Sequence, residues 1–376
     1  MKDNSIFPQG EKVSVALAAL PFVVENIPTW SENEARGKDW AAAGSDNQYF
    51  NWLYSLYEDS ATLQSLINGT TDYVLGNEVI MNFNLGWGPG IVNRKGETIT
   101  ELLGKLQADR LIFGGYYIQV VRDALNKPKE LYYLDYRQVR TNEHNDVFWF
   151  STDFTDNKTY GRCKTITYPK FIPGTEFQQP ASVFMYKGPQ SRGIYPRPCY
   201  SGALKPILTD IKINEFGLNE VSNNFTASAL INLNNGIPDS ETKAKVEKDI
   251  HEKFCGSENA GRFVLSFNQD KDHEVSITRL GADDFDDRYN ALQDRVQSQI
   301  YVAFRATPNL FGLPTKTTGF NSQEYQDAYS LFYKSVIRPY QAALVDSIDK
   351  IIGMKGSISI TPFSLDLDQN NTSNVQ

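Results

Sequence analysis

The chain has 376 residues, enough for two or three domains or for one elongated subunit, and its 40% hydrophobic and 22% charged residues are typical of a globular protein. Its net charge is −8 and no run of Lys or Arg is longer than two, which argues against tight binding of nucleic acid. No stretch reaches the roughly 18 apolar residues of a membrane span. The apolar run at residues 13–24 lacks a strongly basic start, so we expect it to pack within an N-terminal segment rather than to act as a signal peptide.

The region from residue 46 to residue 199 mixes helical and strand patterns. Apolar residues recur at helical spacing from Asp46 to Ile67, and we expect Asn68-Gly69 to end or bend this helix. A second helix is predicted over residues 97–111. A period of two after it predicts strands at residues 116–122, 131–136, 146–151 and 183–186.

A long helix is predicted from residue 201 to residue 228. One row of apolar side chains repeats every seven residues and gains further members three residues on, a pattern typical of a seam that packs on another helix. At about 1.5 Å per residue this helix would be roughly 40 Å long. The seam consists of Leu204, Ile207, Ile211, Leu218, Val221 and Phe225.

A compact insert with the order β-α-β-β is predicted for residues 229–280. Its charged helix reaches Phe254 and carries His251, four residues before Cys255. Two ligands are too few to predict a metal site, and we expect no cofactor. The strands of the insert are expected at residues 229–233, 262–267 and 275–280.

A second amphipathic helix follows the insert. Its first turn is acidic, which suits the positive end of a helix dipole. The acidic residues are Asp283, Asp284, Asp286 and Asp287. Its apolar side, at steps of three and four, consists of Phe285, Tyr289, Leu292, Val296, Ile300 and Phe304.

A break rich in Pro and Gly, residues 307–314, ends this helix and leads into a polar loop, residues 315–321. Ser322 is expected to cap another long helix, in which Ile337-Arg338-Pro339 predicts a kink. The chain then offers a strand at residues 357–363 and a polar tail at residues 364–376 that we expect to be disordered.

The order of these elements resembles the portal proteins of tailed double-stranded-DNA bacteriophages. The shared pattern runs from Phe304 to Pro314, continues with Asn321-Ser322-Gln323-Glu324 and ends with Ile337-Arg338-Pro339. A small α/β module between two long helices, which that family calls the clip between its stem helices, is a second and independent point of agreement. The stretches Trp52–Ser60 and Tyr73–Gly76 are also similar to a peripheral wing helix followed by a short strand.

The resemblance implies an α+β fold of portal architecture and a division of the chain into parts. The parts are an N-terminal segment (1–45), a first portion of the wing (46–199), a stem helix (200–228), a clip (229–281), a second stem helix (282–306), the break with a candidate channel loop (307–321), a wing or crown helix and strand (322–363), and a tail (364–376).

The resemblance also implies a mechanical function without an enzymatic activity. Portal subunits form a ring, usually of twelve, at one capsid vertex of the virion, and the ring is the channel for packaging and ejecting DNA. We expect assembly in the host cytoplasm. The implied partners are further copies of the chain, the major capsid protein, the large terminase that drives packaging, a head–tail adaptor, and double-stranded DNA that passes without sequence specificity; no membrane is involved.

The candidate channel loop would project into this channel, where Lys316 would be the one cation able to touch phosphates. An ordinary connection between two helices is an equally good interpretation of the same residues. The loop consists of Thr315, Lys316, Thr317, Thr318, Gly319, Phe320 and Asn321.

Two other functions remain open from the sequence. The first is a different structural protein of the virion, such as a neck adaptor or a minor capsid protein. The second is a carboxylate-dependent hydrolase or nuclease that uses the acidic cluster at residues 283–287. Helix capping explains this cluster more simply, and the chain has no Gly-x-Ser-x-Gly motif and no recognisable Ser-His-Asp order.

Overall fold

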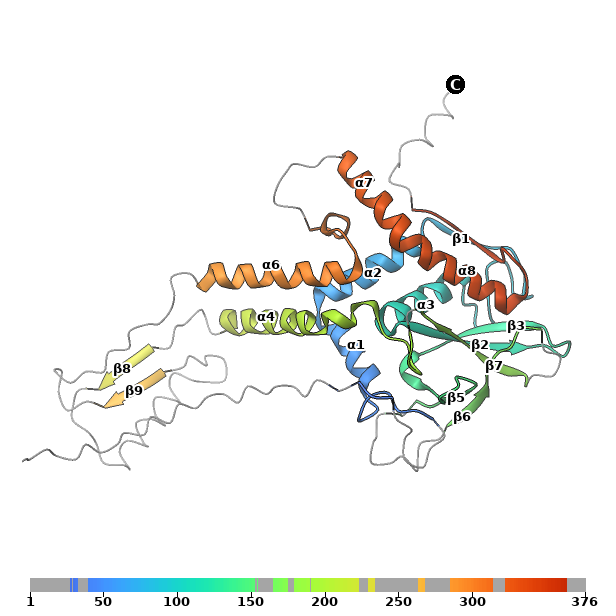
Figure 1. Ribbon diagram of the computed structural model, residues 1–376, viewed down its shortest axis with the longest axis horizontal. Helices are drawn as coiled ribbons and strands as arrows, with labels where there is room; N and C mark the ends of the chain where they lie inside the picture. The colour runs from blue at the N-terminus through green and yellow to red at the C-terminus, as the bar shows by residue number, and fades with distance from the viewer. Residues whose placement is uncertain are drawn as a thin grey trace, which may run out of the picture.

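The fold is known from a computed structural model in which helices and small sheets form a broad body and two long helices project from one side of it (Figure 1). The expected α+β class is confirmed. Among the described helices, none combines the length and apolar character that crossing a membrane requires. The described residues are 28, 30–32, 40–152, 154, 165–174, 179–189, 191–222, 229–233, 263–267, 285–313 and 322–363, so the apolar run at 13–24, the loop at 315–321 and the tail at 364–376 lie outside them.

Two helices, α1 (Tyr49–Asp59) and α2 (Ala61–Leu75), replace the single helix expected from residue 46 to residue 67. The break falls at Ser60, whose backbone is extended, with φ −99° and ψ 109°. The Ser60 hydroxyl caps α2 by accepting a hydrogen bond from the backbone N–H of Leu63. The prediction missed this break because the apolar spacing continues through it.

Helix α2 continues through the expected stop at Asn68-Gly69. Gly69 serves packing here, since a Cβ at this position would lie 2.9 Å from the ring of Phe311. The helix ends at Gly76, which has a positive φ of 65°. The short strand expected at residues 73–76 is therefore wrong: Tyr73 to Leu75 are helical, and the strand is β1 (Glu78–Met81).

Helix α3 (Ile99–Phe113) confirms the predicted second helix. It begins with a capping box, in which the Thr98 hydroxyl accepts from the N–H of Glu101 and the Glu101 carboxylate accepts from the N–H of Thr98. Gly114 ends the helix in the left-handed region with φ 93°. The strands that follow form an antiparallel sheet in the order β3-β2-β7, from β2 (Gly115–Arg122), β3 (Pro128–Leu134) and β7 (Ala181–Lys187).

A second antiparallel sheet, in the order β4-β5-β6, lies below the first in Figure 1. Its middle strand matches the prediction at residues 146–151, whereas the first and third strands were not predicted. Tyr136 is not in a strand as predicted but begins a 3-10 helix capped by Asp135. The strands are β4 (Val139–Thr141), β5 (Val147–Phe150) and β6 (Ile166–Pro169).

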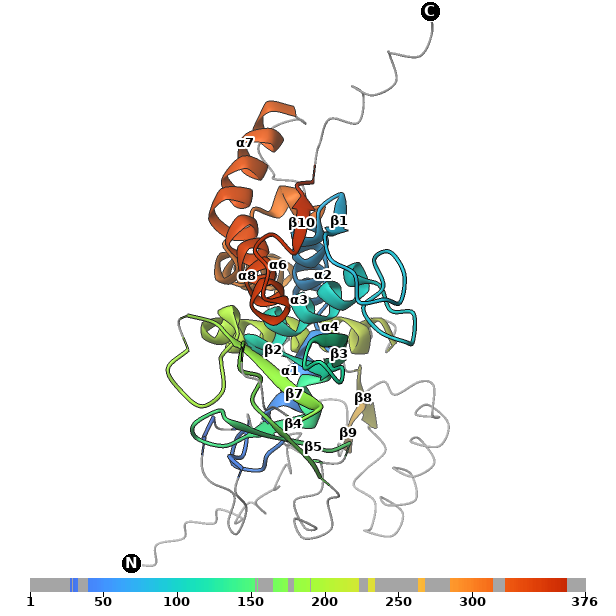
Figure 2. The ribbon, with the colours of Figure 1, turned by 90° about the vertical axis from the view of Figure 1, so that its right-hand side faces the viewer.

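The C-terminal part returns to the start of the body. Helix α7 (Ser322–Phe332) and helix α8 (Arg338–Ile352) are joined by a π-helical segment (Tyr333–Ile337), at the position where a kink was predicted. Strand β10 (Ile358–Thr361) then pairs antiparallel with β1 (Figure 2). This pairing joins two segments about 280 residues apart, as in the pair Val79 and Ile360.

The projecting part consists of α4 (Leu204–Ser222) and α6 (Phe285–Phe304), which we call the stem. Beyond the end of the stem, β8 (Ala229–Leu233) and β9 (Phe263–Phe267) pair in parallel (Figure 1). Both were predicted as strands. The helix expected to reach Phe254, the pair His251 and Cys255, and the strand at residues 275–280 lie outside the described residues.

Two large apolar clusters fill the body, beside a small one around Trp40 and Phe154. The first surrounds α1 and α2, and its rings pack closely: Tyr136 lies 4.9 Å from Phe50 and 4.8 Å from Phe113, measured between ring centroids. This cluster continues into the base of the stem through Ile207 and Ile300. The second cluster lies between α3, α8 and the first sheet. The body and the stem base therefore share one packed interior.

Candidate functional site: the stem and the helix break

The two stem helices are antiparallel and meet along one seam (Figure 1). Toward the far end of the seam, the Tyr289 hydroxyl donates a hydrogen bond of 2.7 Å to the carbonyl oxygen of Ile213. The Tyr289 ring also lies 5.7 Å from the ring of Phe216. Gly217 makes this approach possible, because a Cβ there would lie 3.3 Å from the Tyr289 hydroxyl oxygen. A glycine that costs about 1 kcal/mol of helix propensity thus has a packing role.

The predicted packing residues of the stem fall into four groups. Ile207, Ile211, Val296, Ile300 and Phe304 are buried. Leu204 and Tyr289 are half-buried. Leu218 and Leu292 are exposed, by 67% and 44%, and lie outside the seam. The side chains of Val221 and Phe285 and the whole of Phe225 lie outside the described part of the chain.

The exposed leucines follow from the direction in which each helix faces its partner. In α4 the contacts to Tyr289 come from the Ile213 carbonyl and from Gly217, whereas Leu218 lies about 100° around the helix from Gly217 and outside these contacts. In α6 the seam passes through Tyr289 and Val296, while Leu292 lies on its flank.

The base of the stem is fixed to the body by specific contacts. The Ser60 hydroxyl donates a hydrogen bond of 2.7 Å to a carboxylate oxygen of Asp210, so the cap of α2 is also a contact to α4. Tyr200, in a 3-10 helix just before α4, stacks on Phe304 at 5.7 Å and donates to the carbonyl of Ile112. The direction in which the stem leaves the body is therefore set at both helices.

The connection from β7 to the stem is held by an N-terminal residue that the sequence analysis missed. The Glu32 carboxylate accepts hydrogen bonds of 2.8 Å and 2.9 Å from the backbone N–H groups of Ile194 and Tyr195. Trp30 adds its ring, which lies 5.2 Å from the Arg197 guanidinium. No local pattern in the sequence identifies Glu32, because its partners are more than 160 residues away.

The helix break is held to the body by contacts with Tyr73 of α2. Pro308 begins a 3-10 helix that ends at Gly312, which has φ 83°. The Tyr73 hydroxyl donates a hydrogen bond of 2.9 Å to the carbonyl of Leu310, and the Phe311 ring packs edge-on against Tyr73. The start of the candidate channel loop is thus fixed, although Thr315, Lys316, Thr317, Thr318, Gly319, Phe320 and Asn321 lie outside the described residues.

The other end of that loop leads into α7, which is also anchored. The Tyr329 hydroxyl donates a hydrogen bond of 2.8 Å to the carbonyl of Phe363, just after β10. Further along, the Gln341 side chain donates to the carbonyl of Val74 in α2. The pair α7 and α8 therefore connects the break to the body.

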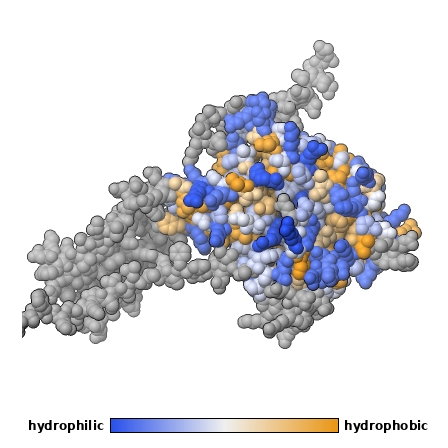
Figure 3. Space-filling view, in the orientation of Figure 1, coloured by the Kyte–Doolittle hydropathy of each residue, from blue (hydrophilic) through white to orange (hydrophobic). Residues whose placement is uncertain are grey.

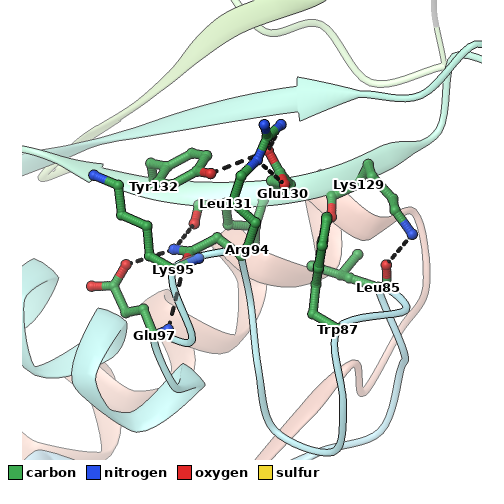
Figure 4. Close-up of polar contacts among 10 residues, drawn as sticks. Leu85, Trp87, Arg94, Lys95, Glu97, Lys129, Glu130, Leu131 and Tyr132 are labelled. Carbon is green, nitrogen blue, oxygen red and sulfur yellow. Dashed lines mark hydrogen bonds and ion pairs between the residues drawn. The ribbon is translucent and has the colours of Figure 1, made fainter.

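At the periphery of the body, the long loop before α3 is fastened to β3 (Figure 4). Arg94 binds Glu130 through two hydrogen bonds of 2.8 Å and 2.9 Å, and these bonds lower the pKa of the Glu130 carboxyl. Trp87 donates to the carbonyl of Lys129, whose ammonium in turn donates to the carbonyl of Leu85. This loop is thus an ordered part of the surface.

The described residues offer no group of three or more metal-type ligands. The acidic residues proposed for a hydrolase are not described as side chains: Asp283 and Asp284 lie outside the described residues, and Asp286 and Asp287 are placed only as helix backbone. The described site therefore consists of a pair of long helices whose base is packed on the body, with the ordered helix break beside it. This arrangement suits a mechanical role.

Two comparisons with known proteins agree with this geometry. The family model described as phage portal protein matches residues 94–370. Similar solved structures include a chain from the virion of a native gene transfer agent particle (17% identity, TM-score 0.51, covering 85% of this chain and 84% of that chain). Another is from the neck of a native gene transfer agent particle computed with C12 symmetry (17% identity, TM-score 0.51, 84% and 84%).

A further similar structure is a crystal structure of an HK97 family phage portal protein from Corynebacterium diphtheriae (10% identity, TM-score 0.50, 82% and 94%). At these identities the structural similarity shows the fold alone. A search of curated proteins found no match. The family model covers most of the chain, and portal proteins are structural proteins rather than enzymes. This chain belongs to the phage portal protein family.

Proposed function

We propose that copies of this chain close into a ring, of twelve subunits, at one vertex of a phage-type particle. The observation that carries the proposal is the rooted stem: two long antiparallel helices leave the body at a fixed angle and carry a separate strand pair beyond their end (Figure 1). When unlike surfaces join identical subunits, the ring closes only if every copy is rotated by the same angle relative to the previous one. A stem held at a fixed angle to the body gives every copy the same shape and so favours such a repeat. The C12 symmetry of the similar neck structure favours twelve copies.

The ring would serve as the channel for packaging and ejecting double-stranded DNA. Twelve copies of a chain with net charge −8 would carry a charge of −96. Such a field disfavours adhesion of DNA to the wall and lets the duplex slide. This agrees with the absence of long basic runs in the sequence.

The parts implied by the family are proposed with their predicted bounds. The stem helices (200–228 and 282–306) would line the channel, and the clip (229–281) would dock the packaging motor and later the adaptor of the neck or tail. Residues 46–199 would form the first part of the wing and residues 322–363 a wing or crown helix and strand, and the wing would face the major capsid protein. The segments 1–45 and 364–376 are proposed as an N-terminal segment and a disordered tail.

The loop at residues 315–321 is proposed to enter the channel. Its support is the position of its first end, since the break just before it is held to the body by the hydrogen bond from Tyr73 to Leu310. Lys316 would then contact passing phosphates. Packaging by Lys316→Glu particles should fall at low salt and recover partly as salt is raised, because screening weakens the new repulsion. Unchanged packaging at all salt concentrations would show that Lys316 does not meet DNA.

The direct test of the ring is negative-stain electron microscopy of the purified full chain. We expect closed rings with a central hole. Compact monomers at high protein concentration would count against the proposal. A different neck or minor capsid protein is the alternative, and it would give rings or shells that restore no packaging to particles lacking a portal.

A further inference from the structure

A cavity of about 540 Å³ lies on the side of the body opposite the stem, between the turn that joins β2 to β3 and the C-terminal end of α8 (Figure 1). We call it the edge cavity. Its apolar lining comes from three segments, through Leu125, Phe171 and Ile351. Leu125 is 77% exposed, and Met354, next to the lining, is 40% exposed. Figure 3 shows apolar residues at the surface of this side of the body, among hydrophilic ones. The described part of the chain thus leaves apolar surface open at this edge.

The charged side chains that line the edge cavity are all cationic: Arg122, Lys127 and Lys350. The buried Nε of Arg122 has no hydrogen-bond partner, and Lys127 makes no ion pair with the described residues. Lys350 pairs with Asp346 one turn away on α8, but both side chains are more than half exposed, and such a pair contributes little to stability. In a chain of net charge −8, the cavity is therefore a place of local positive charge.

The edge cavity is held in shape by contacts of its own walls. The Asp123 carboxylate accepts hydrogen bonds of 2.9 Å from the backbone N–H groups of Leu125 and Lys127, which fixes the turn between the strands. The Arg122 guanidinium lies 4.8 Å from the centre of the Phe171 ring and so joins β2 to the segment after β6. The cavity is thus formed before any ligand arrives.

An apolar lining with cationic side chains fits a peptide segment that is both apolar and acidic. The chain carries such a segment shortly after its last described residue, Leu365-Asp366-Leu367-Asp368, which we call the acidic segment. In an extended conformation successive side chains point to opposite sides, so the two leucines would share one side and the two aspartates the other. Residues 364–376 contain no Lys or Arg that would weaken this charge. The leucines match the apolar lining, and the aspartates match the cations.

The acidic segment begins too far from the edge cavity of its own subunit to occupy it. It starts two residues after Phe363, whose carbonyl accepts a hydrogen bond of 2.8 Å from the Tyr329 hydroxyl. The cavity lies at the other end of β10, where the Ser357 N–H donates to Asp349, just before the lining residues of α8. The extended stretch from Ser357 to Phe363 spans about 20 Å, whereas two residues span at most about 7 Å. A segment that fills the cavity therefore comes from another copy.

We infer that the edge cavity of one copy binds the acidic segment of another copy. This inference rests on the proposed assembly of copies and adds a binding site and its ligand to it. The segment and the cavity are unlike surfaces, so the contact can repeat from copy to copy around a ring. Ordering a short segment costs conformational entropy, and the contact is therefore weak for one pair and is strengthened when assembly holds the copies close together.

Photo-cross-linking tests this contact in the full chain. Leu367 is replaced by the photoreactive residue p-benzoylphenylalanine, and unlabelled copies of this variant are mixed with isotope-labelled copies of the unmodified chain before assembly and irradiation. Mass spectrometry should find the peptide that contains position 367 joined to labelled peptides that contain residues 122–128 or 350–353. A cross-link that combines the two labels shows that segment and cavity belong to different copies. The cross-link is measured in the same sample whether or not rings form.

Charge reversal in the cavity provides the control. Lys127→Glu with Lys350→Glu should lower the yield of these cross-links by about fivefold or more, because two attractions to the aspartates become repulsions. Lys95→Glu with Lys334→Glu changes two exposed lysines outside the cavity and should leave the yield within about twofold. Cross-links that reach only other surfaces, or only the same copy, would overturn the inference while leaving the ring intact. The absence of rings from the unmodified chain would instead overturn the proposed function.

Discussion

The body and the stem of this protein are stabilised in different ways. In the body, several buried polar side chains find partners across long sequence distances: the fully buried Arg140 donates a hydrogen bond of 2.6 Å to Asn47, and the buried Tyr195 hydroxyl donates to Ala41. In the stem, two helices share one narrow seam, and Leu218 and Val302 face outward. Buried side chains of the body thus contact one another within the subunit, whereas large apolar side chains of the stem remain exposed.

This difference indicates which part of the monomer is stabilised by its own packing and which part depends on a partner for its stability. A helix pair with one seam gains little from its own packing, because most helical stability in proteins comes from burying an apolar face. We therefore expect substitutions in the body to change the stability of the monomer strongly. Substitutions in the outer stem should change the monomer little and the assembly much.

The largest effect is expected at the corner between α3 and β2. Gly114 has φ 93°, and a Cβ there would lie 2.3 Å from the carbonyl oxygen of Arg197, a backbone atom that has no room to move. Gly114→Ala should lower the free energy of unfolding by about 2–4 kcal/mol, measured by urea denaturation. Gly96→Ala is the control: φ is 81° but nothing lies within 4 Å, so the loss should be only about 1 kcal/mol. Equal losses would show that the close approach to Arg197 is unimportant.

The next effect is expected at Tyr195. Its hydroxyl donates to the carbonyl of Ala41 at 2.6 Å and accepts from the N–H of Thr141 at 3.1 Å, and all three groups are buried. Tyr195→Phe leaves two buried backbone groups without this partner and should cost about 1–3 kcal/mol of stability. Tyr57→Phe removes an exposed hydrogen bond to Asn68 and should stay within about 0.5 kcal/mol.

Asp109 should make the stability of the body depend on pH. Burial, and then the charge of nearby Asp135, raise the pKa of this carboxyl well above its usual range, and one of its oxygens has no hydrogen-bond partner. A raised pKa in the folded state means that stability is greatest below the ordinary pKa near 4 and declines as pH rises toward the folded value. Asp109→Asn cannot ionise, so it should gain stability relative to the unmodified protein as pH rises.

This is measured by urea denaturation of the full chain across pH 5 to 8. The control is Asp59→Asn at an exposed position of α1, which should leave the slope of stability against pH unchanged. A slope that is identical in the unmodified protein and in Asp109→Asn would mean that Asp109 is already charged in the fold.

The smallest effect on the monomer is expected in the stem. Tyr289→Phe removes the hydrogen bond to Ile213. It should lower the free energy of local opening of the stem by about 0.5–1.5 kcal/mol rather than the free energy of global unfolding. Hydrogen exchange should become faster in the outer half of α4 and stay unchanged in α3. Faster exchange throughout the body would show that stem and body unfold as one unit and would contradict the comparison.

The elements with local signals were predictable from the sequence. Thr98 and Glu101 identify the start of α3, and the alternation after Gly115 identifies β2. The stop of the stem helix before Pro308 follows from the chemistry of Pro. In each case the residues that decide the structure lie within a few positions of one another.

The features that depend on distant partners were not predictable. Ser60 breaks the first helix while its hydroxyl bonds to Asp210, 150 residues away, and β1 is a strand because β10 reaches it. Periodicity in α4 placed Leu218 in the packing row, but the structure leaves its side chain exposed, because periodicity does not give the direction in which a row faces. For the candidate site, the stem and the break could be predicted in their order along the chain, and tertiary packing decided which leucines were left exposed.

The most direct test of the account is the mass of the native assembly, measured by native mass spectrometry on the full chain at increasing concentration. We predict one closed species of about 510 kDa, which is twelve times the 42.5 kDa mass of the chain. A dimer that does not grow further would contradict the account, because a two-fold contact joins like surfaces and cannot repeat around a ring.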